Sequence, residues 1–147
     1  MEYNSSNFLI ETEVPATEVI ISRTDLDGNI TFANEMFLYI SGYSSSELIG
    51  QPHNILRHPD MPKAVFQEMW DTLKATNKWE GIVKNLRKDQ GFYWVYASIS
   101  GVFKDGKLVE YKSVRVPITH EEKEKAQSKY DQIKQETGDT LRTISYS

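Results

Sequence analysis

The sequence predicts an α+β fold: a five-stranded antiparallel sheet with short helices on one face and a C-terminal helix. Strand-like stretches rich in β-branched and aromatic residues stand on both sides of a segment with helical periodicity. The turn dipeptides Asp27-Gly28 and Asp105-Gly106 each separate two such stretches, which is typical of β-hairpins. This order favours helices gathered on one sheet face, with space for a small molecule between the layers.

The first half of the core contains a hairpin and two short helices. Strands are expected at about 19–24 and 29–33. Asn34 can cap a helix that ends at Ser41-Gly42, and a second short helix ends at Gly50.

The segment 51–62 is too interrupted by proline for a long regular element. Asp60 is expected to cap the next helix, which runs to about Ala75 and carries an apolar stripe made of Val65, Phe66, Met69, Trp70 and Leu73. Strands at 78–87, 92–104 and 108–119 then form a meander, and a charged helix begins at about His120.

The bulk properties indicate one folded domain. The chain has 147 residues, 12% of them aromatic, and a net charge of −4, which argues against a nucleic-acid partner. We expect an N-terminal cap or flexible segment at 1–17, the domain itself at 18–119, and a charged helix, connector and tail at 120–147.

The chain contains no cysteine, so it can form neither a disulfide nor a cysteinyl cofactor adduct. No apolar run approaches the roughly 20 residues needed to span a bilayer. We therefore expect a cytoplasmic location, with membrane association only through a receptor partner or a region missing from this sequence.

Two long stretches carry a family resemblance. The segments ISRTDLDGNITFANEMFLYISGYSSSELIG and KNLRKDQGFYWVYASIS resemble the PAS family, over about residues 14–120. More specifically, GQPHNILRHPDMP, FQEMW and WEGIVKNLRKDQGFYWV resemble the FAD-binding PAS sensor domain of Aer-type aerotaxis receptors. One departure is Tyr96-Ala97-Ser98, where that family tends to read RAN.

The resemblance implies a noncovalently bound FAD whose redox state is passed to a chemotaxis signalling partner. That partner is either a methyl-accepting signalling domain or a separate transducer protein. The positions that match those implicated in flavin binding are Arg57, His58, Asp60 and Trp70, with Asn34, His53 and Asn85 as further matches.

The residue chemistry allows both a cofactor role and a plain structural role. Arg57 could pair with a pyrophosphate through its planar donor fork and His58 could donate to phosphate or ribose. Alternatively, Arg57 could be solvated and Asp60 could serve only as a helix cap. Trp70 could stack on the cofactor or, with Phe66, pack the helix onto the sheet.

The third predicted strand offers one face to the pocket. A period of two places Trp79, Gly81, Val83 and Asn85 together, and we expect this face to line the site because a buried amide needs a hydrogen-bond partner. On the fourth strand Tyr93 and the small Ala97 share a face that leaves room for a planar ring.

The orientation of Arg115 is open. It interrupts an apolar alternation with Val114 and Val116, so it either points to solvent or, if inward, could stabilise an anionic reduced flavin.

These observations predict a redox or oxygen sensor for energy taxis that binds FAD and is not an enzyme, since no nucleophile stands beside a base. The histidine spacing argues against a structural metal. The alternatives are a haem-binding PAS gas sensor and a cofactor-free PAS dimerisation module, and homodimer formation stays open.

Overall fold

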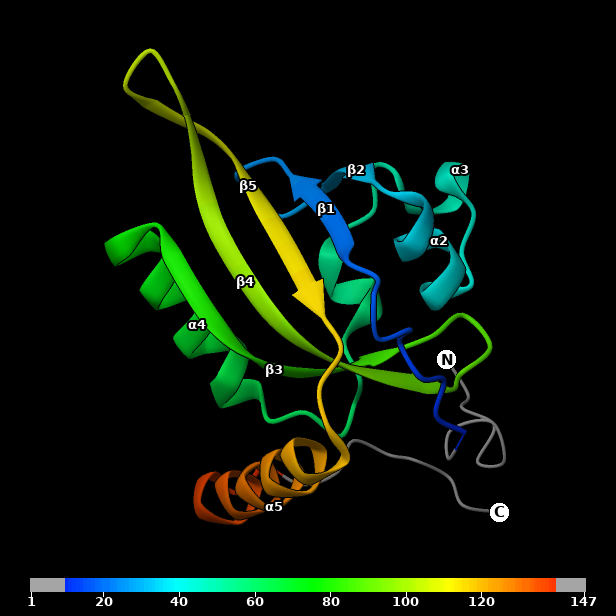
Figure 1. The fold of residues 1–147 in the computed structure, drawn as a ribbon. Coiled ribbons are helices and arrows are strands. Elements are labelled where there is room, and N and C mark those ends of the chain that lie inside the picture. Colours follow the sequence, from blue (N-terminus) through cyan, green and yellow to red (C-terminus); the bar gives the residue numbers. More distant parts are fainter. Residues whose placement is uncertain (1–9, 140–147) are drawn as a thin grey trace.

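The chain builds a single five-stranded antiparallel sheet, shown in Figure 1 for a computed structural model that describes residues 10–139. The strands are β1 (Ile20–Thr24), β2 (Ile30–Ala33), β3 (Lys78–Leu86), β4 (Phe92–Lys104) and β5 (Lys107–Val116). Their order is β2-β1-β5-β4-β3, so the last strand in the chain is the central one. The predicted segments before residue 10 and after residue 139 lie outside the described residues.

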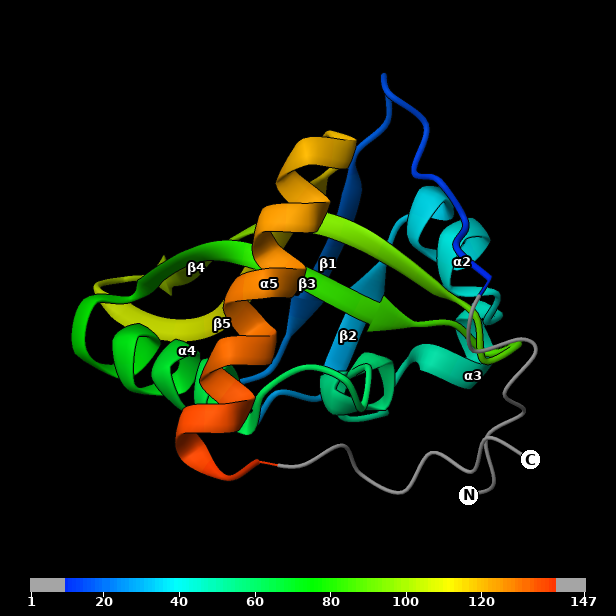
Figure 2. The ribbon, with the colours of Figure 1, turned by 90° about the horizontal axis from the view of Figure 1, so that it is seen from below.

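Helices fill the connection between β2 and β3 and close the described chain. They are α2 (Glu35–Ser41), α3 (Ser45–Leu48), the 3₁₀ helix η1 (His53–Leu56), α4 (Lys63–Thr76) and α5 (His120–Thr137). Figures 1 and 2 show α5 beside the edge strand β3, at the far side of the sheet from β2. The predicted fold class and element order are confirmed.

Local capping explains where the short helices begin. The Asn34 side chain accepts a hydrogen bond from the Phe37 backbone N–H at 3.0 Å and starts α2, as predicted. Ser44 and Glu47 form a reciprocal capping box at α3. The predicted cap by Asp60 is wrong: α4 begins after Pro62, and its Lys63 N–H donates to the Asp139 carboxylate at 2.6 Å.

The core lies between the sheet and the helices α2 to α4. Each large apolar side chain buried there stabilises the fold by roughly 1.5–3 kcal/mol. Its most buried members are Ile20, Ile30, Phe37, Ile40, Leu48, Leu56, Leu73, Tyr93 and Val95. Where this layer meets η1 and α4 it does not close completely, and a cavity remains.

Candidate functional site

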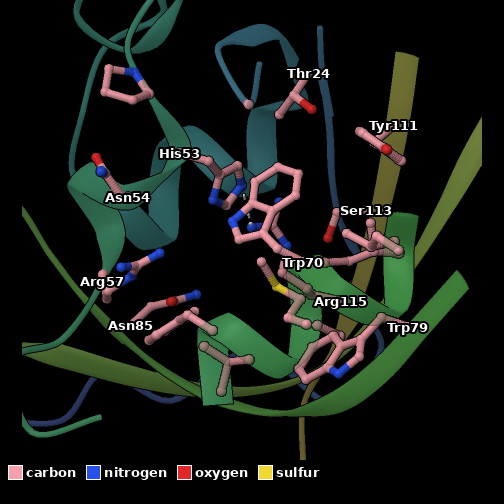
Figure 3. Close-up of a pocket in the computed structure, with 18 of the residues that line it drawn as sticks. Thr24, His53, Asn54, Arg57, Trp70, Trp79, Asn85, Tyr111, Ser113 and Arg115 are labelled. Carbon is pink, nitrogen blue, oxygen red and sulfur yellow. Dashed lines mark hydrogen bonds between the residues drawn. The ribbon is translucent and has the colours of Figure 1, made fainter. Parts of the chain in front are cut away.

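A cavity of about 260 Å³ lies between the sheet, η1 and α4 (Figure 3). This volume is slightly below the range of roughly 300–1,000 Å³ typical of small-molecule sites, so it matches a fused ring system, and a larger ligand would have to extend beyond it. Its walls contain seven of the residues predicted from the sequence: His53, Arg57, Phe66, Trp70, Trp79, Asn85 and Arg115.

Strand β3 supplies the wall predicted by its period of two. Trp79, Val83 and Asn85 line the cavity and are each buried. The Trp79 indole lies across Gly81, where an added Cβ would stand 2.5 Å from the ring. The indole Nε1–H donates to the Glu68 carboxylate of α4 at 2.6 Å. Gly81 therefore leaves room for the indole, and the hydrogen bond to Glu68 holds the ring flat against the strand.

Arg115 points inward, which decides between the two orientations left open by the sequence. Its side chain is only 2% exposed, because β5 is central and pairs on both sides, with Ile20 and Ala97. The guanidinium donates to Ser22 Oγ at 2.7 Å and to His53 Nε2 at 3.2 Å. Within residues 10–139 it forms no ion pair, and its Nε has no hydrogen-bond partner.

The absence of an anion beside Arg115 determines the electrostatics of the cavity. Burial lowers the pKa of the Arg115 guanidinium to about 10, so it remains charged at neutral pH. A buried cation without a counter-charge is costly, although the face of Phe37 lies 4.5 Å from the guanidinium carbon and compensates in part. The site is therefore prepared to receive an anion or a ring rich in acceptors.

His53 is neutral in this setting. Burial, reinforced by the charge of Arg115, lowers the pKa of His53 to about 3. Its Nε2 also lies 3.3 Å from Ser22 Oγ, and its ring stacks on Phe37 with centroids 5.9 Å apart. The imidazole can thus act as an acceptor and as an aromatic surface, but not as a second cation.

Arg57 brings the second cation to the cavity. Its guanidinium carbon lies 3.9 Å from the ring centroid of Phe66, and its backbone forms an isolated antiparallel bridge with Asn85. This bridge joins η1 to β3 directly. Arg57 and Asn85 therefore lie side by side in the cavity wall (Figure 3).

Trp70 lines the cavity, where the sequence left packing and stacking roles open. Its ring meets Tyr111 of β5 edge to face, with centroids 6.0 Å apart. Gly28 also approaches the indole, since an added Cβ there would lie 3.3 Å from it. Figure 3 shows the indole among His53, Arg115 and Trp79. An indole in the cavity wall can stack on a planar ligand.

Four of the predicted residues lie outside the cavity lining. Asn34 caps α2 and also accepts from the Ile21 N–H at 3.1 Å. His58 is buried edge-on against Phe92, and Asp60 binds side chains of α5. Tyr93 is buried opposite Asn85 in the β3–β4 register, and its hydroxyl has no hydrogen bond of normal geometry among the described residues.

Sequence reasoning missed several polar wall residues. Thr24 and Ser113 line the cavity, and Ser22, which hydrogen-bonds to Arg115, is fully buried. The signal was present in the period of two, which places Ile20, Ser22 and Thr24 on one face of β1. It places Ser113 and Arg115 on the face of β5 that lies beside it. Small polar residues on a strand face that also carries a core residue indicate a cavity wall.

The described range offers neither a metal site nor a membrane-spanning helix. No group of three or more His, Asp or Glu side chains between residues 10 and 139 is arranged to hold a metal ion. None of the helices in that range has the length and apolarity needed to cross a bilayer.

The antiparallel sheet, its helical insertion and the cavity between them match a known family. The sequence profile of the PAS fold aligns with residues 30–115, which is more than half of the chain. The chain belongs to the PAS family. This PAS domain is 46% identical over 121 residues to the aerotaxis receptor of Escherichia coli (strain K12), a match covering 81% of this chain and 24% of the receptor. The chain thus spans about a quarter of that relative's length.

Solved structures agree with the assignment. The PAS domain of a protein from Colwellia psychrerythraea superposes with a TM-score of 0.62 at 27% identity, covering 69% of this chain and 86% of that one. The dark structure of the blue-light photoreceptor Aureochrome1 LOV reaches a TM-score of 0.67 at 20% identity, covering 78% of this chain and 86% of that one, and shares the fold. The PAS domain described here therefore shares its fold with both structures.

Proposed function

We propose that this PAS domain is a redox sensor that binds FAD noncovalently and passes its redox state to a chemotaxis signalling partner. The observation that carries the proposal is the buried Arg115, a cation with no counter-charge among the described residues, in the wall of an aromatic cavity. A ring that gains negative charge on reduction would supply that counter-charge.

The residues present fit a flavin. The ring system would lie against Trp70 and the sheet, with the Asn85 and Asn54 amides able to donate to and accept from its polar edge. Arg57 offers a planar donor fork for the pyrophosphate. When bound, the flavin supplies reversible reduction with a change of charge. The protein would supply the stacking surface, the hydrogen bonds and the fixed charge of Arg115.

The mode of signalling follows from the composition. With no cysteine in the chain, a flavin here cannot form a cysteinyl adduct, so its state would be read through charge and hydrogen bonding. We propose that the change reaches a methyl-accepting signalling domain or a separate transducer in the cytoplasm. The relative named above is an aerotaxis receptor, which supports a partner of this kind.

The visible spectrum of the purified protein tests the proposal. We expect oxidised-flavin absorption bands, and chromatography of the released cofactor should give FAD rather than FMN. A colourless protein that gains no flavin bands on addition of FAD would contradict the proposal. An intense Soret band containing iron would establish the haem sensor instead, and self-association without any cofactor would favour the dimerisation module.

A pair of arginine variants tests the assigned site. Arg57→Met should retain the fold but lose most of the FAD content, because it removes a cation from the cavity wall. Arg23→Met is the matched control, since Arg23 is exposed on β1 and pairs with Glu110 at 3.0 Å. Equal flavin content in both variants would argue against this placement of the cofactor.

A further inference from the structure

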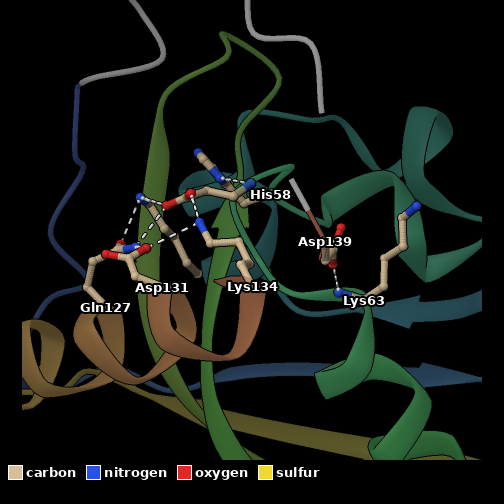
Figure 4. A network of polar contacts seen from close by, with 8 residues as sticks. His58, Lys63, Gln127, Asp131, Lys134 and Asp139 are labelled. Carbon is tan, nitrogen blue, oxygen red and sulfur yellow. Dashed lines mark hydrogen bonds and ion pairs between the residues drawn. The ribbon is translucent and has the colours of Figure 1, made fainter. Parts of the chain in front are cut away.

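Helix α5 is joined to the loop before α4 through one carboxylate. The Asp60 carboxylate accepts from Lys84 Nζ of β3 at 3.2 Å and from Gln127 Nε2 of α5 at 2.9 Å, and it also pairs with Lys134 of α5. We call these four residues the Asp60 cluster (Figure 4). It connects three segments that are far apart in the sequence.

The Asp60 cluster is sheltered from solvent. The side chains of Asp60, Lys84 and Lys134 are only 16%, 13% and 11% exposed. Burial raises the pKa of the Asp60 carboxyl, but the hydrogen bond from Lys134 and the charge of Lys84 outweigh it and keep the pKa below its usual range. Removing one member of such a cluster leaves a partly buried charge unpaired, which costs far more than breaking a surface ion pair.

The cluster lies directly behind the cavity wall. Lys84 precedes Asn85 in β3, and Asp60 follows three residues after Arg57. Arg57 and Asn85 line the cavity and are bridged to each other through their backbones. In the segment from Arg57 to Asp60, the Asp60 N–H donates to His58 Nδ1 at 3.0 Å. This hydrogen bond fixes the turn that carries the Asp60 carboxylate.

A second contact joins the end of α5 to the same wall. The Asp139 carboxylate accepts from the backbone N–H of Lys63, the first residue of α4, whose own N-cap residue Pro62 provides no side-chain cap. Helix α4 carries Phe66 and Trp70 into the cavity. Figure 4 shows this contact beside the Asp60 cluster.

We infer that Asp60 is a positioning residue of the cavity: its carboxylate holds the wall at Arg57 and Asn85 against helix α5, so that a ligand in the cavity and docking of α5 stabilise each other. Thermodynamic linkage makes this coupling reciprocal. The part that concerns the ligand rests on the flavin proposal, whereas the part that concerns the wall does not.

Hydrogen exchange tests the part that needs no ligand. In the full chain, Lys134→Gln should accelerate exchange both in the second half of α5 and in residues 57–62, although it changes only α5. Asp60→Asn should do the same. Lys125→Gln is the matched control, because Lys125 is exposed on the same helix and pairs with Glu121 at 3.2 Å, away from Asp60. Acceleration confined to α5 in Lys134→Gln would overturn the inference.

FAD titration, followed by the quenching of flavin fluorescence, tests the coupling. We expect Asp60→Asn and Lys134→Gln to weaken binding on the order of tenfold, with Lys125→Gln unchanged. FAD should also slow exchange at residues 127–137 in the unmodified protein. Circular dichroism and thermal unfolding identify any variant that fails to fold.

The exchange experiment and the FAD titration together distinguish a failure of the flavin proposal from a failure of the inference about Asp60. An unmodified protein that binds no FAD would contradict the flavin proposal, while the exchange data would still decide the role of Asp60. Unmodified affinity for FAD in a Lys134→Gln variant whose α5 exchanges rapidly would overturn the coupling and leave the flavin proposal intact.

Discussion

The guanidinium of Arg115 donates to Nε2 of His53 across 3.2 Å, and this contact fixes the protonation of the imidazole. Because a guanidinium can only donate, Nε2 must accept, so the ring is neutral and carries its proton on Nδ1. The inner end of the cavity therefore combines one fixed positive charge with one neutral acceptor.

Arg115→Met should leave the domain stable but change the redox behaviour proposed for it. Replacing a buried charge that lacks an ion pair by an apolar side chain is often neutral or stabilising, so the free energy of unfolding without ligand should stay the same or rise. The midpoint potential of bound FAD should fall, by about 59 mV for each tenfold loss in relative affinity for the one-electron reduced form. Urea unfolding and a spectroelectrochemical titration measure the two quantities. Arg23→Met should change neither, and an unchanged potential in Arg115→Met would sink the proposed role.

The stability of the domain should fall as the pH falls below about 6.5. Burial lowers the pKa of both His53 and His58 to about 3, whereas an unfolded histidine titrates near 6.5. Between these values the unfolded chain binds more protons, so the free energy of unfolding decreases by up to about 1.4 kcal/mol per pH unit for each histidine.

Urea unfolding between pH 7.5 and 4.5, where most carboxylates remain ionised, measures this slope. His53→Gln and His58→Gln should each flatten it. His120→Gln is the control at a surface position, since the His120 side chain is 84% exposed. A slope that neither buried-site variant alters would contradict the assignment of the neutral state.

The sequence predicted the sheet well because its strands follow a simple period. The Asn85 face of β3 was correctly assigned to the cavity, since Glu80 and Lys84 occupy the other face. The same rule could not orient Arg115. The apolar Val114 and Val116 suggest that their own face is the inner one, whereas in the structure they lie on the half-buried outer face and the arginine points inward. Only the central position of β5 and the contact with His53 decide it.

Asp60 shows a different limit of the sequence. Its position before Pro62 favours a helix cap, and local rules contain nothing about α5, which begins sixty residues later in the chain. The structure instead assigns the capping contact to Asp139 and the Asp60 carboxylate to Lys84, Gln127 and Lys134. Contacts between elements distant in sequence depend on the tertiary arrangement and not on local pattern.

Gly81→Ala should destabilise the domain by displacing Trp79. The backbone at this position is ordinary strand, so the cost comes from the added Cβ, which would stand 2.5 Å from the indole. Overpacking of this kind typically costs about 1–3 kcal/mol. A double-mutant cycle with Trp79→Leu in urea unfolding measures it, and the cost of Gly81→Ala should shrink when the indole is absent. An equal cost in both backgrounds would assign the effect to the strand backbone.

Lys123→Met should release the N-terminal segment from the domain. The Lys123 ammonium lies 2.6 Å from a Glu11 carboxylate oxygen and 2.7 Å from one of Glu13, so it ties residues 11–13 to α5. The same segment forms backbone hydrogen bonds with Phe92 at the start of β4. Because hydrogen bonds to charged groups contribute about 1.5–3 kcal/mol, their loss should free this segment without unfolding the sheet.

Limited proteolysis should then cut near residues 10–14 faster in Lys123→Met than in Lys125→Met, and the difference should shrink at high salt if the charges are responsible. Equal cleavage of the two variants would mean that the backbone contacts with Phe92 hold the segment without help from Lys123.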